Sequence, residues 1–83
     1  MNQELLQRFL RDEANSYVRQ LLLSHISDCR AGLAHGRRTF EFNQFNVTID
    51  CESHIAVIED ELNLTPGGET FYSLEDFLVA LWR

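Results

Sequence analysis

The chain has 83 residues, of which 45% are hydrophobic, enough for one small domain with a real core and too many for a disordered chain. Its formal net charge of −6 disfavours nucleic-acid binding, and it has no apolar run of the roughly 18 residues that a membrane span needs. The first residues lack the apolar stretch of a secretion signal, so we expect a soluble, cytoplasmic protein.

Charge is unevenly distributed along the sequence. Residues 1–38 contain six arginines against four acidic residues, whereas residues 39–83 contain nine acidic residues against a single arginine. No lysine is present. The acidic second half favours either a basic protein partner or simple solubility.

Residues 1–35 are predicted to be helical, because apolar residues recur at steps of three or four in a stripe that includes Tyr17 and ends at Leu33. One continuous helix would be roughly 50 Å long, more than the roughly 30 Å expected for a compact chain of this size. Asn15–Ser16 offers two good N-cap residues, so we favour a pair of helices and keep one long helix as the alternative. Gly36 is expected to end the helical part.

Residues 38–62 are predicted to form an antiparallel β-meander, because apolar and polar residues alternate there with a period of two. Turns are expected at Asn43–Gln44 and Glu52–Ser53. The third strand, His54–Glu61, is apolar on both faces, as is typical of a well-covered strand. The side chains expected to face the helices from the middle strand are Phe45, Val47, Ile49 and Cys51.

Residues 63–72 are predicted to be a loop that can contain a short fourth strand at Thr70–Tyr72. Residues 73–83 are predicted to be a helix, with Ser73 as N-cap and Asp76 three residues later. The expected fold is therefore a single α+β domain, residues 1–83. It consists of an N-terminal helix or helix pair, a three- to four-stranded antiparallel meander and a short C-terminal helix.

Four side chains are candidate zinc ligands. His25 and Cys29 lie four residues apart on one predicted helix face, and Cys51 and His54 flank a predicted turn. Both cysteines occupy apolar positions, where a free cysteine packs as a small hydrophobic residue, and Cys-x₂-Cys is absent. We therefore predict cysteines packed in the core and no metal. Two cysteines are also too few for a disulfide framework and agree with a reducing compartment.

Catalysis is not indicated by the sequence. The histidines are scattered over different elements, and both cysteines are expected to be buried rather than poised in a cleft. The acidic runs Glu59–Glu61 and Glu75–Asp76 consist of sequence neighbours, which is typical of a solvated surface. We predict no catalytic residue and no cofactor.

The acidic half is the remaining candidate for function. Carboxylates around aromatic residues are suited to covering a basic groove on another protein, because charge speeds the encounter and aromatic side chains supply affinity. The residues predicted to bind such a partner are Glu52, Glu59, Asp60, Glu61, Glu69, Tyr72, Glu75 and Asp76.

Two segments carry a resemblance to a known family. The strand sequence Ala56–Asp60 (AVIED) and the helix start Ser73–Leu78 (SLEDFL) resemble those of small immunity proteins encoded beside bacterial toxins of contact-dependent inhibition and related polymorphic systems. The resemblance covers residues 39–83. It implies a non-enzymatic inhibitor that neutralises one cognate toxin, with a nuclease as the expected kind. Such families share no fixed contact residues, so none is transferred.

Two alternatives remain open at this stage. The first is a homodimeric structural or regulatory module that associates through the N-terminal amphipathic helix. The second is a small zinc-binding domain.

Overall fold

The computed structural model describes residues 3–62 and 68–82. The radius of gyration is 11.9 Å, as expected for a compact chain of this length. The predicted α+β arrangement is confirmed, with two N-terminal helices, an antiparallel sheet and a short C-terminal helix. In chain order the elements are α1 (Gln3–Asp12), α2 (Ser16–Arg30), β1 (Arg37–Glu41), β2 (Phe45–Asp50), β3 (Ile55–Asp60), β4 (Glu69–Ser73) and α3 (Leu74–Trp82).

The break between α1 and α2 occurs where the capping residues predict it. Asn15 has extended backbone geometry, and its side-chain oxygen accepts a hydrogen bond of 2.9 Å from the Val18 N–H. Most of the predicted apolar stripe is buried, but Tyr17 and Leu33 are 72% and 77% exposed. For these two the prediction is wrong, because Tyr17 lies in the first turn of α2 on its solvent side and Leu33 lies beyond the helix end.

The end of α2 also differs from the prediction. The helix stops at Arg30, and Gly32 instead of Gly36 supplies the left-handed residue, with a φ of 76°. The N–H of Gly32 donates to the carbonyl of Cys29, and that of Leu33 donates to the carbonyl of Asp28. This is a Schellman cap, which satisfies the last carbonyls of the helix. Gly32 is therefore the stop signal.

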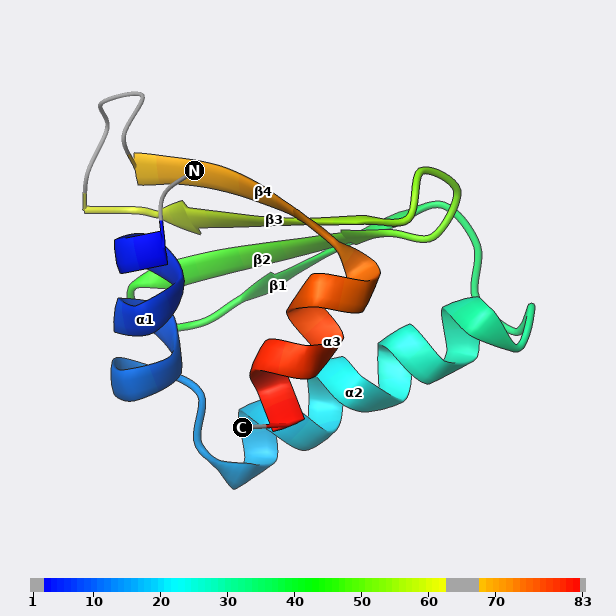
Figure 1. Cartoon of the computed structure of the whole chain (residues 1–83), viewed down its shortest axis with the longest axis horizontal. Coiled ribbons are helices and arrows are strands. Elements are labelled where there is room, and N and C mark those ends of the chain that lie inside the picture. Colours follow the sequence, from blue (N-terminus) through cyan, green and yellow to red (C-terminus); the bar gives the residue numbers. More distant parts are fainter. Residues whose placement is uncertain (1–2, 63–67, 83) are drawn as a thin grey trace.

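The four strands form one antiparallel sheet in the order β1-β2-β3-β4 (Figure 1). The predicted Asn43–Gln44 turn is present and is closed by a hydrogen bond of 3.0 Å from the Phe42 N–H to the Phe45 carbonyl. The possible fourth strand is formed as β4. The predicted third strand is shorter than expected, because His54 belongs to the preceding turn with a φ of 58°. The predicted loop residues 63–67 lie outside the described part of the chain.

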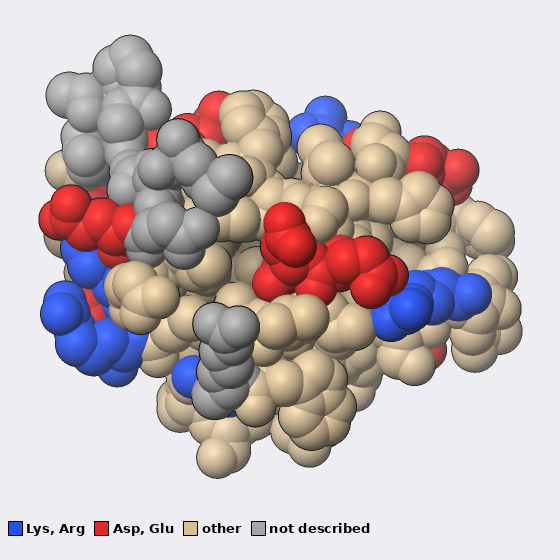
Figure 2. Space-filling view, viewed as in Figure 1, with Lys and Arg blue, Asp and Glu red and all other residues tan. Residues whose placement is uncertain are grey.

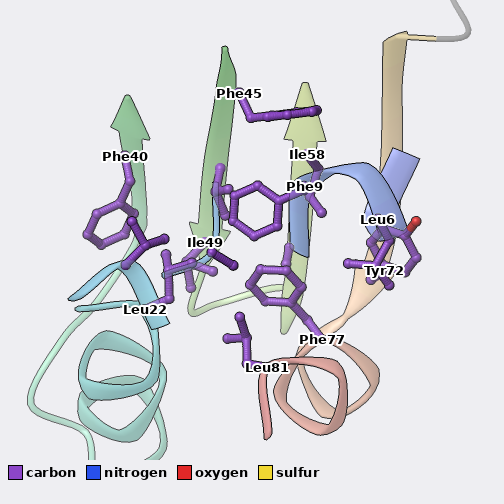
Figure 3. Close-up of a cluster of buried hydrophobic side chains, with 14 of the residues drawn as sticks. Leu6, Phe9, Leu22, Phe40, Phe45, Ile49, Ile58, Tyr72, Phe77 and Leu81 are labelled. Atoms are coloured by element: carbon purple, nitrogen blue, oxygen red, sulfur yellow. The ribbon is translucent and has the colours of Figure 1, made fainter. Parts of the chain in front are cut away.

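All three helices lie on the same side of the sheet (Figure 1). The side chains predicted to face them from β2 do so, and Phe45, Val47 and Ile49 are fully buried. Phe9 of α1 points into the middle of this cluster (Figure 3), with its ring centroid 5.7 Å from that of Phe45 and 6.4 Å from that of Phe77. Within the described residues, no helix covers the other face of the sheet.

The C-terminal helix is fixed at both ends. At its start, the Ser73 Oγ accepts a hydrogen bond of 3.1 Å from the Asp76 N–H, as predicted. At its end, the guanidinium of Arg19 donates a hydrogen bond of 2.6 Å to the carbonyl of Leu81. A cation at a helix C-terminus is favourable, so Arg19 ties α3 to α2.

Candidate functional site

The uncovered face of the sheet carries the candidate site. Side chains alternate between the two faces of a strand, so the residues between those that face the helices project to this face. Residues that pair across neighbouring strands form rows that cross the sheet. The hydroxyl oxygens of Thr39 and Thr48, neighbours in one of these rows, lie 2.8 Å apart. The rows, read from the strand register, are Arg37–Asp50–Ile55–Ser73, Thr39–Thr48–Val57–Phe71 and Glu41–Asn46–Glu59–Glu69.

Carboxylates dominate the last of these rows. Glu41 and Glu59 are the two cross-strand partners of Asn46, and Glu69 is the partner of Glu59. Glu61, just beyond β3, accepts a hydrogen bond of 2.8 Å from the Asn46 side-chain amide. We call Glu41, Glu59, Glu61 and Glu69 the acidic strip. Asn46 lies at its centre.

The acidic strip lacks a neutralising cation in the part of the chain that the structure describes. Within residues 3–62 and 68–82, none of its four carboxylates is in an ion pair. Glu59 and Glu69 are moreover directly opposite on neighbouring strands, an arrangement of like charges that destabilises a sheet. The strip therefore presents concentrated negative charge to solvent.

An aromatic side chain lies beside the acidic strip. Phe71 is on the outer face of β4, two residues from Glu69, and is 61% exposed. Its cross-strand partner Val57 is only 5% exposed although it lies outside the core cluster, so its neighbours already shield it. Phe71 thus adds an exposed apolar group at the β4 end of the acidic strip, two residues from Glu69.

The acidic residues near the turn between β2 and β3 have a different environment. Glu75 lies 3.3 Å from Arg30, Glu52 lies 3.8 Å from His35, and Asp50 lies 3.7 Å from Arg37. These partners come from the helical half of the sequence or directly after it, and the two arginines among them offset part of the charge imbalance. On the face seen in Figure 2, acidic side chains form separate groups with basic ones near them.

The predicted partner-binding residues therefore do not form one patch. Glu59, Glu61 and Glu69 are together, and Glu52, Glu75 and Asp76 lie at the opposite end of the strands. Sequence reasoning missed Glu41, which reaches the strip only through the pairing of β1 with β2. A hairpin register counted from the Asn43–Gln44 turn would have placed it there.

Asp60 was predicted at the surface, but it is buried and serves the fold. It is 4% exposed, and the Arg8 guanidinium donates to it at 2.6 Å. Burial by itself raises the pKa of Asp60. The hydrogen bonds from Arg8, the Leu62 N–H and the Gln44 amide outweigh this, so its pKa lies below the ordinary value. Asp60 joins α1 to the sheet and is removed from the candidate site.

Tyr72 was also predicted to contact a partner, and it is also buried. It is 6% exposed, packs in the core near Leu6 (Figure 3), and burial raises the pKa of its phenol. Because residues alternate along β4, the exposed aromatic is its neighbour Phe71. Tyr72 pairs with Ala56 of β3, which is also buried, so both residues lie on the face that the helices cover.

The cysteines give the largest departure from expectation. They were predicted to be reduced and separately packed, but Cys29 of α2 and Cys51 after β2 form a disulfide, with Cα atoms 5.2 Å apart. His25 lies beside them, and the potential ligand atoms of the three residues all lie within 4.8 Å of one another. His54, the fourth zinc candidate, is exposed in the turn and is not in this group.

His25 has an unusual environment for a polar side chain. Its Nε2 atom is buried without a hydrogen-bond partner, and its ring stands edge-on to Phe40 at 5.4 Å. Burial, with a smaller effect of Arg38, lowers the pKa of the imidazole. The environment of the ring therefore disfavours its protonated form.

A shallow groove lies on the helical side of the molecule. It has a volume of about 470 Å³ and lies between α2 and α3, where it is lined by Leu23, Ile26, Ser27, Arg30, Ala31, Leu78 and Trp82. Trp82 is 73% exposed at its rim.

No helix within residues 3–62 and 68–82 combines the length and apolar character needed to cross a membrane. In comparisons with known proteins, no family model, curated protein or solved structure matches this chain.

Proposed function

We propose that this protein is a non-enzymatic, immunity-type inhibitor that acts in the cytoplasm and neutralises a basic toxin domain, with a nuclease as the expected class. The acidic strip and Phe71 form the contact surface in this proposal. The AVIED and SLEDFL segments that carry the family resemblance form β3, at the centre of this surface, and the start of α3.

One observation supports the proposal above the others: an acidic strip that no cation of the described residues neutralises, on a sheet face that no described helix covers. Glu59 and Glu69 repel each other across the strands, and the fold gains nothing from that repulsion. Unfavourable local arrangements of this kind are expected at functional sites, where a partner relieves them. Cations on a toxin domain would do so.

The molecule is large enough to offer an interface of standard size. It measures 34 × 25 × 21 Å, so a face bounded by its two longest extents is comparable with the roughly 800 Å² that a standard protein interface buries on each partner. Carboxylates raise the association rate with a basic partner, whereas an exposed ring such as that of Phe71 contributes affinity once water is excluded. The strip and Phe71 supply both functions side by side.

The homodimer alternative loses its main support. It relied on an apolar stripe along the N-terminal helices, and Leu5, Phe9 and Leu22 of that stripe are fully buried in the chain's own core. A dimer remains a prediction that analytical ultracentrifugation tests directly.

The decisive experiment co-expresses this protein with the toxin domain encoded by the adjacent reading frame. Wild type should restore growth. The triple variant Glu41→Gln, Glu59→Gln, Glu69→Gln and the single variant Phe71→Ala should protect less well, because they remove charge and the aromatic anchor without touching the core.

The matched control changes the same number of charges elsewhere. The variant Glu52→Gln, Glu75→Gln, Asp76→Asn also removes three negative charges, at the opposite end of the strands, and should protect as wild type does. Equal loss in both triple variants would mean that only net charge matters. Full protection by the strip variant and by Phe71→Ala would refute the proposed surface.

A further inference from the structure

Three potential metal ligands converge at the C-terminal end of α2. His25 and Cys29 are one helical turn apart on the same face, and Cys51 reaches them from the end of β2. Cys51 is fixed there by a hydrogen bond of 2.9 Å from its N–H to the Gly36 carbonyl. This hydrogen bond joins the end of β2 to the segment after α2 without involving the sulfur atoms.

His25 points to a role for this cluster beyond a disulfide. Its buried Nε2 has no hydrogen-bond partner, although a buried polar atom is normally satisfied. The oxidised cysteines supply no hydrogen-bond partner for this nitrogen. A metal ion held by the two sulfur atoms would instead bind an unprotonated nitrogen of the imidazole.

We propose that reduction of the Cys29–Cys51 disulfide turns this cluster into a zinc site with His25, Cys29 and Cys51 as its three protein ligands. Two thiolates and one imidazole are a donor set that suits zinc, and the fourth tetrahedral position remains open to water. Zinc–ligand bonds of about 2.0 to 2.3 Å place tetrahedral ligand atoms roughly 3.5 to 3.8 Å apart. The potential ligand atoms of the three side chains already lie within 4.8 Å of one another, so small rotamer changes are enough to reach these distances.

The chemistry balances with a dithiol as reductant. Two electrons pass from the dithiol to the S–S bond, the dithiol becomes a disulfide, and its two protons pass to Cys29 and Cys51. Zinc then displaces these two protons when it binds the thiolates. Cys29 is half-buried and Cys51 is buried, so the reductant is expected to attack at Cys29. A reducing compartment favours the metal-binding form.

The test uses the full chain, reduced with a phosphine under anaerobic conditions and titrated with Co²⁺ as a spectroscopic probe. Reduced wild type should bind one Co²⁺ with thiolate-to-cobalt charge-transfer absorption, and one equivalent of Zn²⁺ should displace it. Oxidised wild type should show neither signal. A reduced protein without charge-transfer absorption would overturn the proposal.

Two histidine variants assign the third ligand. His25→Ala should weaken Co²⁺ binding by about 10-fold or more, because a ligand is lost and even loss of an outer-shell partner costs about 10- to 100-fold in affinity, whereas His54→Ala should bind as wild type does. Equal affinity in both variants would refute a role for His25.

Circular dichroism keeps the test decisive if reduction unfolds the chain. Refolding on addition of Zn²⁺ supports the site, because binding energy then becomes folding energy. An unfolded chain that stays unfolded with Zn²⁺ counts against the site. This inference does not depend on the proposed inhibitor function, since it needs no partner protein.

Discussion

One substitution in the acidic strip, Glu59→Gln, is expected to raise the stability of the protein and to weaken its binding to the partner. Glu59→Gln keeps the size of the side chain and removes the charge opposite Glu69. Two carboxylates about 6 Å apart at a solvated surface repel each other by about 0.7 kcal/mol, which agrees with the ~0.2–1 kcal/mol of cross-strand pairs. We therefore expect the free energy of unfolding to rise by about 0.5 kcal/mol, and Tm to rise by about 2–4 °C.

The same substitution should weaken binding. Removing one charge from a surface that attracts a basic partner slows association, by about two- to fivefold at low salt, and the difference should vanish at about 1 M salt, where charges are screened within ~3 Å. Urea unfolding measures the first effect on the isolated protein, and stopped-flow association with the toxin domain measures the second.

Two controls make this prediction specific. Glu75→Gln removes the same charge but breaks the 3.3 Å contact with Arg30, so it should leave Tm unchanged or slightly lower and leave the association rate unchanged. The double variant Glu59→Gln, Glu69→Gln should gain less than the sum of the single variants, because the repulsion is removed only once. A loss of stability in Glu59→Gln, or additive single effects, would show that the two carboxylates do not repel each other.

Three further predictions concern the fold. Asp60→Asn should lower the free energy of unfolding by about 2 kcal/mol at pH 7. Removing one partner of a fully buried ion pair costs ~3–5 kcal/mol, and the cost is smaller here because the Arg8 side chain is 31% exposed. Since the folded pKa of Asp60 lies below its unfolded value, its contribution is fully present above the unfolded pKa and is lost as the pH falls through the folded pKa. The deficit of Asp60→Asn in urea unfolding should therefore shrink from pH 5 to pH 3, and a constant deficit would contradict the assignment. The Cys29–Cys51 disulfide closes a loop with a sequence separation of 22, so its reduction in the absence of metal should lower the free energy of unfolding by about 3 kcal/mol. Equal urea midpoints with and without reductant would disprove this. Asn15→Ala should cost about 1 kcal/mol and Asn15→Ser much less, and equal losses would argue against side-chain capping.

Local chemistry determined much of this fold from sequence alone. The capping side chains of Asn15 and Ser73 start α2 and α3, because they satisfy N–H groups within their own first turns. The alternation from Phe45 to Cys51 predicted the buried face of β2, because the apolar face of a strand packs on the core and a shift by one residue would expose it. These signals act over a few residues, so they can be recognised without knowledge of the tertiary contacts.

Other features depend on which distant segments meet. The pairing of Cys29 with Cys51 follows from the docking of α2 beneath the end of β2, and neither local pattern contains that information. The difference between buried Asp60 and half-buried Glu59 depends on the position of Arg8 in α1, which decides where a carboxylate can be fully buried.

The acidic surface shows both contributions. The sequence alone determined that negative charge gathers in the second half of the chain, because charge is fixed by composition. Only the tertiary structure decided which charges remain uncompensated. Folding brings Arg30 to Glu75 and Arg37 to Asp50, but it brings no cation to Glu59 or Glu69 within the described residues. The physical reason is that Coulomb energy depends on distances in space, which the strand register and helix docking set.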